Sequence, residues 1–143
     1  MKKILLAQTD TTVGFLSQDV TRLEEIKMRT GGKPFLKVYS EFKNLRQDIR
    51  IPSLHKRRVR HAHKTTFVVK NQAFRYVNDP EHSRLIHPYK WLYSTSANES
   101  GKSYDPLFCH AACDVIIEDS RGLHEQSASE IFLLNTTHLK QLR

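Results

Sequence analysis

The sequence predicts an α/β fold in which helices pack on a twisted, open sheet of mixed parallel and antiparallel strands. Short apolar runs bounded by polar residues recur along the chain and indicate strands. Amphipathic segments alternate with these runs early and late in the sequence, whereas two β-rich runs near the middle are spaced as a hairpin. A chain of 143 residues suits one domain that buries roughly two-thirds of its unfolded surface, so a single domain over 1–143 is expected.

In the first half of the chain, expected strands alternate with expected helices. The run "ILLA" ends in the polar "QTDTT", which predicts a buried strand over 4–7 followed by a turn. The next segment spaces its apolar side chains for a helix, with Val20, Leu23 and Ile26 on one face, Asp19 as N-cap and a glycine pair as the stop. A second strand is expected over 34–40, and a second helix over 40–49 with Ser40 as its cap.

The second half begins with a basic loop and continues with the hairpin. We expect hairpin strands at 65–70 and 73–77, separated by "NQ". Further elements follow in order: helix 80–86, strand 91–95, helix 105–113, and strands 114–119 and 130–134.

The chain is strongly basic. Lys and Arg outnumber Asp and Glu by 23 to 15, which gives a formal net charge of +8 and favours a polyanionic partner. Much of the excess lies in the loop "LHKRRVRHAHK", where Lys56, Arg57, Arg58 and Arg60 are candidates for contacts with RNA phosphates. A solvated basic loop is an equally good interpretation of that segment. The apolar start is too short for a signal peptide and no later segment suits a bilayer, so we expect a cytoplasmic protein without membrane contact.

Two features suggest sites that the rest of the sequence does not complete. Cys109 and Cys113 flank "HAA" at helical spacing, but no second ligand pair follows at zinc-site spacing, so two buried thiols are favoured over a metal site. The "GKS" at 101–103 resembles the end of a phosphate-binding loop, yet Ser96 stands where that loop requires glycine.

Four polar clusters stand at expected strand or helix ends, and each alone has an ordinary structural explanation. Together they favour a single anionic ligand, because they are rich in cations and hydrogen-bond donors. Their members are Thr9, Asp10 and Thr11; Lys27, Arg29 and Lys33 around the glycine pair; Ser94, Thr95, Ser96 and Asn98; and Ser127 and Ser129.

The motifs that carry these clusters resemble those of the YrdC/YciO family. The chain contains "TDTTVG", "KMRTGGKPF", "KTTFVV", "STSANESG" and "SASEI" in the order of the family's PTDTVYGL, KGRPxxKPL, PxTF, STSANxSG and PSTI. The order covers nearly the whole chain, and STSANxSG is a specific match. Arg75 and His82 are similar to part of the family's VRxPxHP.

The resemblance implies a threonylcarbamoyl-AMP synthase, which joins L-threonine, bicarbonate and ATP with Mg²⁺, releases pyrophosphate, and serves threonylcarbamoyladenosine formation in tRNA. Other tRNA-modification proteins are then expected as partners. The family's KxR and SxN signatures fall on Lys27, Arg29, Ser96 and Asn98, which are the expected catalytic residues. The implied ATP site adds Lys33, Ser94 and Ser129, and the implied threonine site comprises Thr9, Asp10, Thr11 and Arg75.

The implied chemistry needs cations and positioning more than a base. Threonine carbamate is itself the nucleophile toward the α-phosphorus of ATP, so Lys27 is expected to serve ligand charge rather than the core. Two alternatives stay open. One is a non-catalytic protein of this fold that binds tRNA or double-stranded RNA, and the other is carbamoyl transfer through a carbamoyl-adenylate.

Overall fold

The structure is a computed structural model that describes residues 1–29 and 34–143. Five α-helices lie in these residues: α1 (Val20–Lys27), α2 (Phe42–Asp48), α3 (Lys56–His61), α4 (Pro80–Ile86) and α5 (Pro106–Ala112). Two 3-10 turns, Ser53–His55 and His87–Tyr89, precede α3 and follow α4. Within the described residues, every helix is too short and too polar to pass through a bilayer.

The strands of the described residues form one mixed sheet, which confirms the expected fold class. They are β1 (Leu5–Gln8), β2 (Val13–Ser17), β3 (Leu36–Tyr39), β4 (Thr65–Val69), β5 (Gln72–Tyr76), β6 (Trp91–Ser96), β7 (Val115–Ile117), β8 (Glu130–Leu134) and β9 (Leu139–Gln141). Their order in the sheet is β7-β1-β2-β6-β3-β5-β4-β8-β9. The pairs β1/β7, β3/β5 and β4/β8 are parallel, and the remaining neighbours are antiparallel.

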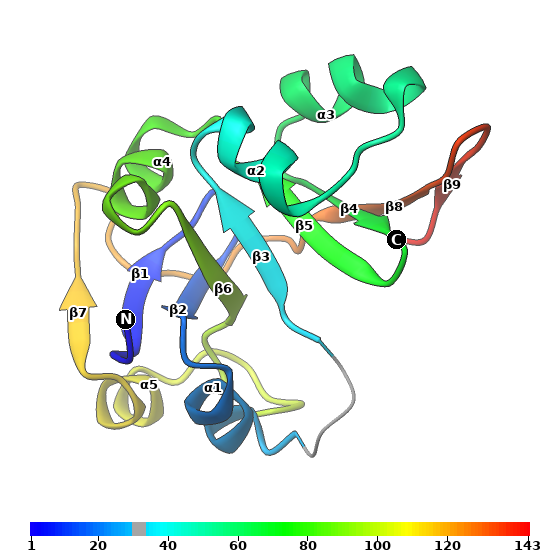
Figure 1. Ribbon diagram of the computed structural model, residues 1–143. Helices are drawn as coiled ribbons and strands as arrows, with labels where there is room; N and C mark the ends of the chain where they lie inside the picture. Colours follow the sequence, from blue (N-terminus) through cyan, green and yellow to red (C-terminus); the bar gives the residue numbers. More distant parts are fainter. Residues whose placement is uncertain (30–33) are drawn as a thin grey trace.

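The helices divide unevenly between the two faces of the sheet. One face carries two apolar clusters: α1 and α5 cover β1 and β2 there, while α2 and α3 cover β4 and β5. Figure 1 shows these two helix pairs at separate ends of the sheet. On the opposite face α4 packs its Ile86 over Leu5, Leu16 and Val38. We call this second side the α4 face; α4 covers only part of it.

Local sequence explains several element ends. The Asp19 side chain accepts from the Arg22 backbone N–H at the start of α1, and Asp79 and Asp105 cap α4 and α5 in the same way. The hairpin between β4 and β5 turns at Lys70 and Asn71, both with positive φ, which is the conformation that a tight two-residue turn requires. The predicted cap Asp19 and the predicted hairpin are therefore confirmed, although the turn lies one residue earlier than "NQ".

Several expectations about the elements are wrong. β2 was not expected; its five residues are all buried, so they lack the alternation that identifies a half-buried strand. Part of the basic loop is the helix α3, whose only buried residue is Val59 and which therefore has almost no apolar period. β9 was missed because all three of its residues are exposed.

Two predicted residue roles in the helices also fail. Glu41 rather than Ser40 occupies the N-cap of α2, and the buried hydroxyl of Ser40 has no hydrogen-bond partner among the described residues. Val20 is 37% exposed because α1 turns it away from Leu23, which is fully buried. The predicted glycine stop at 31 and 32 lies outside the described residues; α1 ends at Lys27, and Met28 adopts the left-handed conformation.

Gly14 on β2 allows a close approach between the turn after β1 and strand β6. A methyl group at this position would lie 3.0 Å from the Thr95 carbonyl oxygen and 3.1 Å from the Thr9 methyl carbon. We predict that Gly14→Ala lowers the free energy of unfolding by about 1–3 kcal/mol, measured by urea denaturation, because the backbone must move to relieve these contacts. An unchanged unfolding midpoint would show that the strands yield without cost.

Candidate functional site

Most of the sequence-predicted polar residues lie on the α4 face or at its edge. Side chains two apart on a strand share a face, and paired residues on neighbouring strands do so as well. The registers Gly14↔Ser96, Leu16↔Ser94 and Val38↔Arg75 therefore bring Ser94, Ser96 and Arg75 to the face that contains Leu16 and Val38. Thr66 of β4 joins them through its contact with Arg75.

The first polar cluster joins the end of α1 to the loop that follows β6. Lys27 Nζ donates three hydrogen bonds: to Ser96 O at 3.0 Å, to Asn98 O at 3.0 Å and to Asn98 Oδ1 at 2.6 Å. Ser96 Oγ donates to the same Asn98 Oδ1 at 2.7 Å, and Ser100 Oγ donates to Lys27 O. The predicted catalytic residues Lys27, Ser96 and Asn98 are thus in direct contact, and we call this arrangement the lysine clamp.

The lysine clamp corrects the expectation that Lys27 lies outside the core. Its side chain passes beneath the loop and the residue is 4% exposed. Burial of the ammonium, and secondarily the neighbouring Arg29, lower the pKa of Lys27 to about 8. An ammonium has three N–H donors, and all three are used by protein oxygens. Lys27 therefore stabilises the loop structure in addition to placing positive charge beneath it.

Arg29 is the cation of this region whose side chain makes no hydrogen bond with the described residues. Its guanidinium lies over the Phe35 ring, 4.5 Å from the centroid, and makes no ion pair with the described residues. Stacking on an aromatic ring leaves the edge of a guanidinium available to an anion. Lys33, the third cation of the predicted cluster, lies outside the described residues.

The "GKS" segment is part of the loop and not a phosphate cradle. Lys102 Nζ forms an exposed ion pair with Glu99 at 2.9 Å, and Lys102 O accepts from Asn98 Nδ2. Gly101 has φ of +78° and nothing crowds it. The segment therefore closes the loop around Asn98.

The second polar cluster is organised by Arg75 of β5. Its guanidinium donates to Asp10 Oδ1 at 2.6 Å, to Thr11 Oγ1 at 3.1 Å and, through two nitrogens, to Thr66 Oγ1 at 3.1 and 3.4 Å. The side chains of Arg75 and Asp10 are each 5% exposed. The structure thus brings together Asp10, Thr11 and Arg75, all expected near threonine, and we call this group the arginine hub.

Asp10 is held ionised at the hub. Burial alone would raise its pKa, but hydrogen bonding to His82 and the positive charge of Arg75 outweigh burial, so the pKa of Asp10 is lowered to about 2. His82 is fully buried, and that burial lowers its pKa despite the nearby carboxylate. Its Nδ1 lies 3.2 Å from the Asp10 backbone N–H, while its Nε2 has no partner among the described residues.

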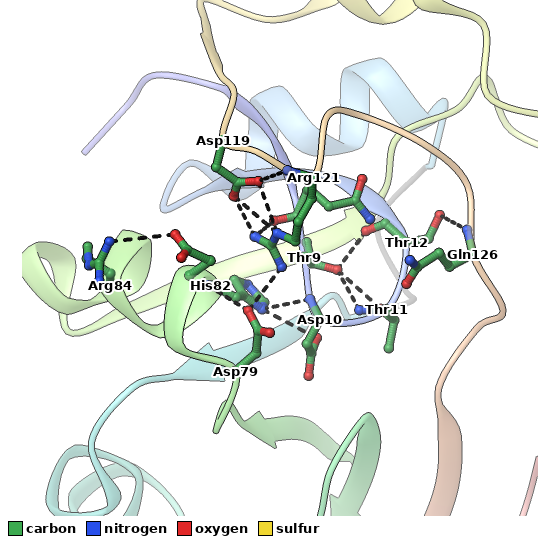
Figure 2. Close-up of polar contacts among 12 residues, drawn as sticks. Thr9, Asp10, Thr11, Thr12, Asp79, His82, Arg84, Asp119, Arg121 and Gln126 are labelled. Atoms are coloured by element: carbon green, nitrogen blue, oxygen red, sulfur yellow. Dashed lines mark hydrogen bonds and ion pairs between the residues drawn. The ribbon is translucent and has the colours of Figure 1, made fainter.

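The turn of residues 9–12 is fixed from both sides. Thr9 Oγ1 donates to Thr12 O at 2.6 Å and accepts from the Thr11 backbone N–H at 3.2 Å. Figure 2 shows Asp10 and His82 facing each other on one side of this turn and Gln126 beside Thr12 on the other. The turn is therefore rigid and largely buried.

The long connection from β7 to β8 crosses the same turn. Arg121 is held by Asp119 and Asp79 and donates to Gln8 O at 3.2 Å, as Figure 2 illustrates. The His124 and Gln126 backbone N–H groups donate to Gln8 Oε1 and Thr12 Oγ1. Sequence reasoning missed Arg121, because Asp119 is its only nearby partner, while Asp79 and Gln8 lie 42 and 113 residues away.

Ser129 connects the arginine hub to a hollow at the edge of the site. Its hydroxyl lies 2.8 Å from Thr66 Oγ1 and 3.3 Å from Arg143 Nη2, and the residue is buried. A hollow of about 480 Å³ adjoins it, lined by His63, Lys64, Gln126 and Ser127 among others. Thr66 stands in the "KTTFVV" motif but was not predicted as a site residue; its place beside Arg75 depends on pairing between β4 and β5.

The predicted RNA-binding residues lie elsewhere. Lys56, Arg57, Arg58 and Arg60 are exposed on or at the start of α3, and none forms an ion pair with a described carboxylate. Cys109 is buried beside α1, and Cys113 is half-buried at the end of α5. Across the described residues, no three His, Cys, Asp or Glu side chains are grouped as a metal site would require.

Comparison of the sequence with protein-family models and with curated proteins finds no match. Solved structures do match. The structure of P. abyssi Sua5 complexed with L-threonine superimposes with a TM-score of 0.74 at 19% identity, over 99% of this chain and 50% of the Sua5 chain. A double variant of the same Sua5 gives 0.77 at 21% identity, over 99% and 49%. The chain thus spans about half the length of P. abyssi Sua5.

Shorter and longer proteins share the fold as well. E. coli YciO matches with a TM-score of 0.79 at 16% identity, over 99% of this chain and 82% of YciO. HypF in its phosphate- and nucleotide-bound form matches with 0.77 at 16% identity, over 99% of this chain and 22% of HypF. The chain therefore has the fold of Sua5 and YciO, as the resemblance of its motifs implies.

We predict that the arginine hub contributes to the acid sensitivity of the fold. The lowered pKa of Asp10 means that its ion pair stabilises the protein above the unfolded value of 3.8, and that this stability is lost as pH falls toward 2. Asp10→Asn should lower the free energy of unfolding at neutral pH by about 3 kcal/mol, because it leaves Arg75 buried without a counter-charge. Urea denaturation at several pH values measures both effects. A variant as stable as the wild type at neutral pH would contradict the assignment.

We also predict that the lysine clamp orders the loop after β6. Lys27→Met keeps the length of the side chain but removes the three donors, so backbone amides of 97–102 should exchange with deuterium about tenfold faster, measured by mass spectrometry. Lys102→Met is the control, because Lys102 forms only an exposed ion pair in the same loop. Equal exchange rates in the two variants would show that Lys27 does not hold the loop.

Proposed function

We propose that this protein is a threonylcarbamoyl-AMP synthase. It joins L-threonine, bicarbonate and ATP to give threonylcarbamoyl-adenylate and pyrophosphate, for threonylcarbamoyladenosine modification of tRNA. The observation that carries the proposal is the contact of Lys27 with Ser96 and Asn98, which lie 69 and 71 residues further along the chain. Arg29 lies beside this contact. Motif resemblance and the shared fold support the reaction class, since one of the matched Sua5 structures is a complex with L-threonine.

The reaction begins with a carbamate. The amine of threonine attacks bicarbonate, a C–N bond forms and water leaves. A carbamate oxygen then attacks the α-phosphorus of ATP; the new P–O bond forms as the bond to the β-phosphate bridging oxygen breaks, and pyrophosphate departs. The attacking group is already an anion, so this step requires charge compensation and alignment.

The residues near the lysine clamp suit the phosphate side of this reaction. Arg29 offers a guanidinium edge without a carboxylate partner among the described residues, and Lys27 adds charge beneath the loop. Ser96 is exposed, and we propose that its hydroxyl turns from Asn98 Oδ1 to donate to a phosphate oxygen when ATP binds. Lys33 is proposed as a further phosphate ligand. ATP enters with Mg²⁺ bound to its phosphates, as is usual for nucleotide substrates.

The arginine hub suits the amino-acid side. Thr9 and Ser94 lie close to Gly14, where the turn after β1 meets strand β6 beside the hub. Asp10, Thr11 and Arg75 form the adjoining wall, and we propose that threonine lies against it. The 480 Å³ hollow beside Ser129 then offers space for the nucleoside end of ATP.

We predict threonine-dependent pyrophosphate release by the purified protein supplied with ATP, Mg²⁺ and bicarbonate. Arg29→Gln should lower kcat about 100-fold, because a cation near the developing charge is lost, while Arg57→Gln on α3 serves as the control and should leave turnover unchanged. Circular dichroism confirms that both variants are folded. Absence of threonine-dependent release overturns the synthase; release with carbamoyl phosphate in place of threonine and bicarbonate indicates carbamoyl-adenylate chemistry instead.

A second candidate function is RNA binding without catalysis. The observation that favours it is the row of exposed cations at Lys56, Arg57, Arg58 and Arg60, none of which is paired with a described carboxylate. Salt-sensitive binding of tRNA or double-stranded RNA, together with no turnover in the pyrophosphate assay, would support this candidate over the first.

A further inference from the structure

A separate groove lies at the opposite side of the sheet from the arginine hub. Its volume is about 1040 Å³, and it runs between the end of α2, the segment before α3, the β4–β5 turn and the end of β8. Side chains alternate between the two faces along β4 and β8. Val69 and Leu134 line the groove and belong to the cluster under α2. Thr66 and Ser129, from the same part of the chain as each strand, lie on the other face with Arg75. The groove is independent of the proposed catalysis.

The floor of the groove is apolar, and Ser53, Asn135 and Thr136 add neutral polar groups to its lining. Ile49, Ile51 and Val69 form its floor and are fixed in the core, each no more than 5% exposed. Leu54 stands at the margin with 68% of its surface exposed, which is unusual for a leucine in a short 3-10 turn. Pro52 and Leu133 add partly exposed apolar surface. A rigid floor with an exposed leucine at its edge suits an apolar side chain from a partner.

All charged residues that line the groove are cationic. Arg46, Arg50, Lys56 and Lys70 line it, all four are exposed, and no carboxylate is among the lining residues. None of the four forms an ion pair with a described acidic side chain; the nearest acid on α2, Asp48, instead accepts from Tyr39 at 2.8 Å and lies 4.0 Å from Lys37. A positive margin around an apolar floor is complementary to an acidic amphipathic segment.

We propose that this groove docks an acidic amphipathic segment of another protein, with leucine-like side chains on the floor and carboxylates at the four cations. Duplex RNA fits less well, since its phosphates seek a cationic surface and gain nothing from the apolar floor or from Leu54. A second copy of this chain also fits less well, because its net charge of +8 repels it from a positive margin.

The test uses the full chain and a fluorescein-labelled synthetic peptide with leucines at i, i+3, i+4 and i+7 and glutamates at most other positions. Fluorescence anisotropy should show saturable binding that weakens with salt. Replacing the glutamates of the peptide by glutamine, or its leucines by serine, should each weaken binding about tenfold. Absence of saturable binding, or binding indifferent to the leucines, overturns the proposal.

Matched variants localise the binding to the groove. The double variant Arg46→Glu with Arg50→Glu should weaken the peptide about tenfold or more, whereas Arg57→Glu with Arg58→Glu changes two cations outside the groove and should have a much smaller effect. Leu54→Ser should weaken binding, while Leu107→Ser, at an 83% exposed leucine on α5, should not. Equal losses within either pair would show that the peptide senses only overall charge or hydrophobicity.

Two further outcomes decide against the proposal. A short duplex RNA that binds more tightly than the peptide, and whose binding depends on Arg46 and Arg50 but not on Leu54, identifies the groove as an RNA site. Dimers in analytical ultracentrifugation that Leu54→Ser dissociates identify a second copy of the chain as the occupant. Neither result changes the interpretation of pyrophosphate release, which depends on residues that do not line the groove.

Discussion

The buried ion pair between Arg75 and Asp10 is the interaction on which the arrangement of the α4 face depends. Arg75 belongs to β5 and Asp10 to the turn after β1, and β2, β6 and β3 lie between these strands in the sheet. A guanidinium this deeply buried requires hydrogen-bond partners, and Asp10, Thr11 and Thr66 together supply at least one to each of its three nitrogens. The sheet must therefore curve enough to bring its two halves to one arginine. That curvature creates a face with polar side chains beside an apolar patch covered by α4.

The two buried cations, Lys27 and Arg75, have the same structural role at two places. Each donates to several oxygens from distant segments and so fixes backbone positions that no single secondary-structure element fixes. Charge fixed in this way stabilises a ligand anion without reorganisation, which is the property that efficient transition-state stabilisation requires. Arg29, stacked on Phe35, makes no hydrogen bond with the described residues through its side chain. In the proposed site, Arg29 would therefore be free to bind the ligand directly, while Lys27 and Arg75 hold the surrounding structure.

The sequence predicted those features that depend on local pattern. Asp19 was identified as a cap because its side chain acts within three residues, and the central hairpin because its strands are separated by a two-residue turn. The burial of Lys27 was not predicted, since its partners Ser96 and Asn98 lie about 70 positions away and composition alone suggests an exposed lysine. Thr66 was missed because its partner Ser129 is distant in the sequence, and Arg121 because Asp79 and Gln8 are. Three elements were missed because their sequences hide the usual periodicity. β2 is buried on both faces, β9 is exposed on both faces, and α3 consists mainly of cations.

Strands β4 and β8 contribute residues to the groove and, directly or through the residue before β8, to the proposed site. The two surfaces therefore share the backbone of these strands. Val69 and Leu134 point toward the groove, while Thr66 of the same strand β4 and Ser129, which directly precedes β8, contact each other on the α4 face. A side chain seated on the groove floor cannot displace Val69 or Leu134 without moving the backbone that positions Thr66 and Ser129, because interiors are close-packed. Since Thr66 also accepts from Arg75, such a movement would reach the arginine hub through a single hydrogen-bonded step. The rigidity of the floor is therefore what keeps the hub independent of whatever occupies the groove.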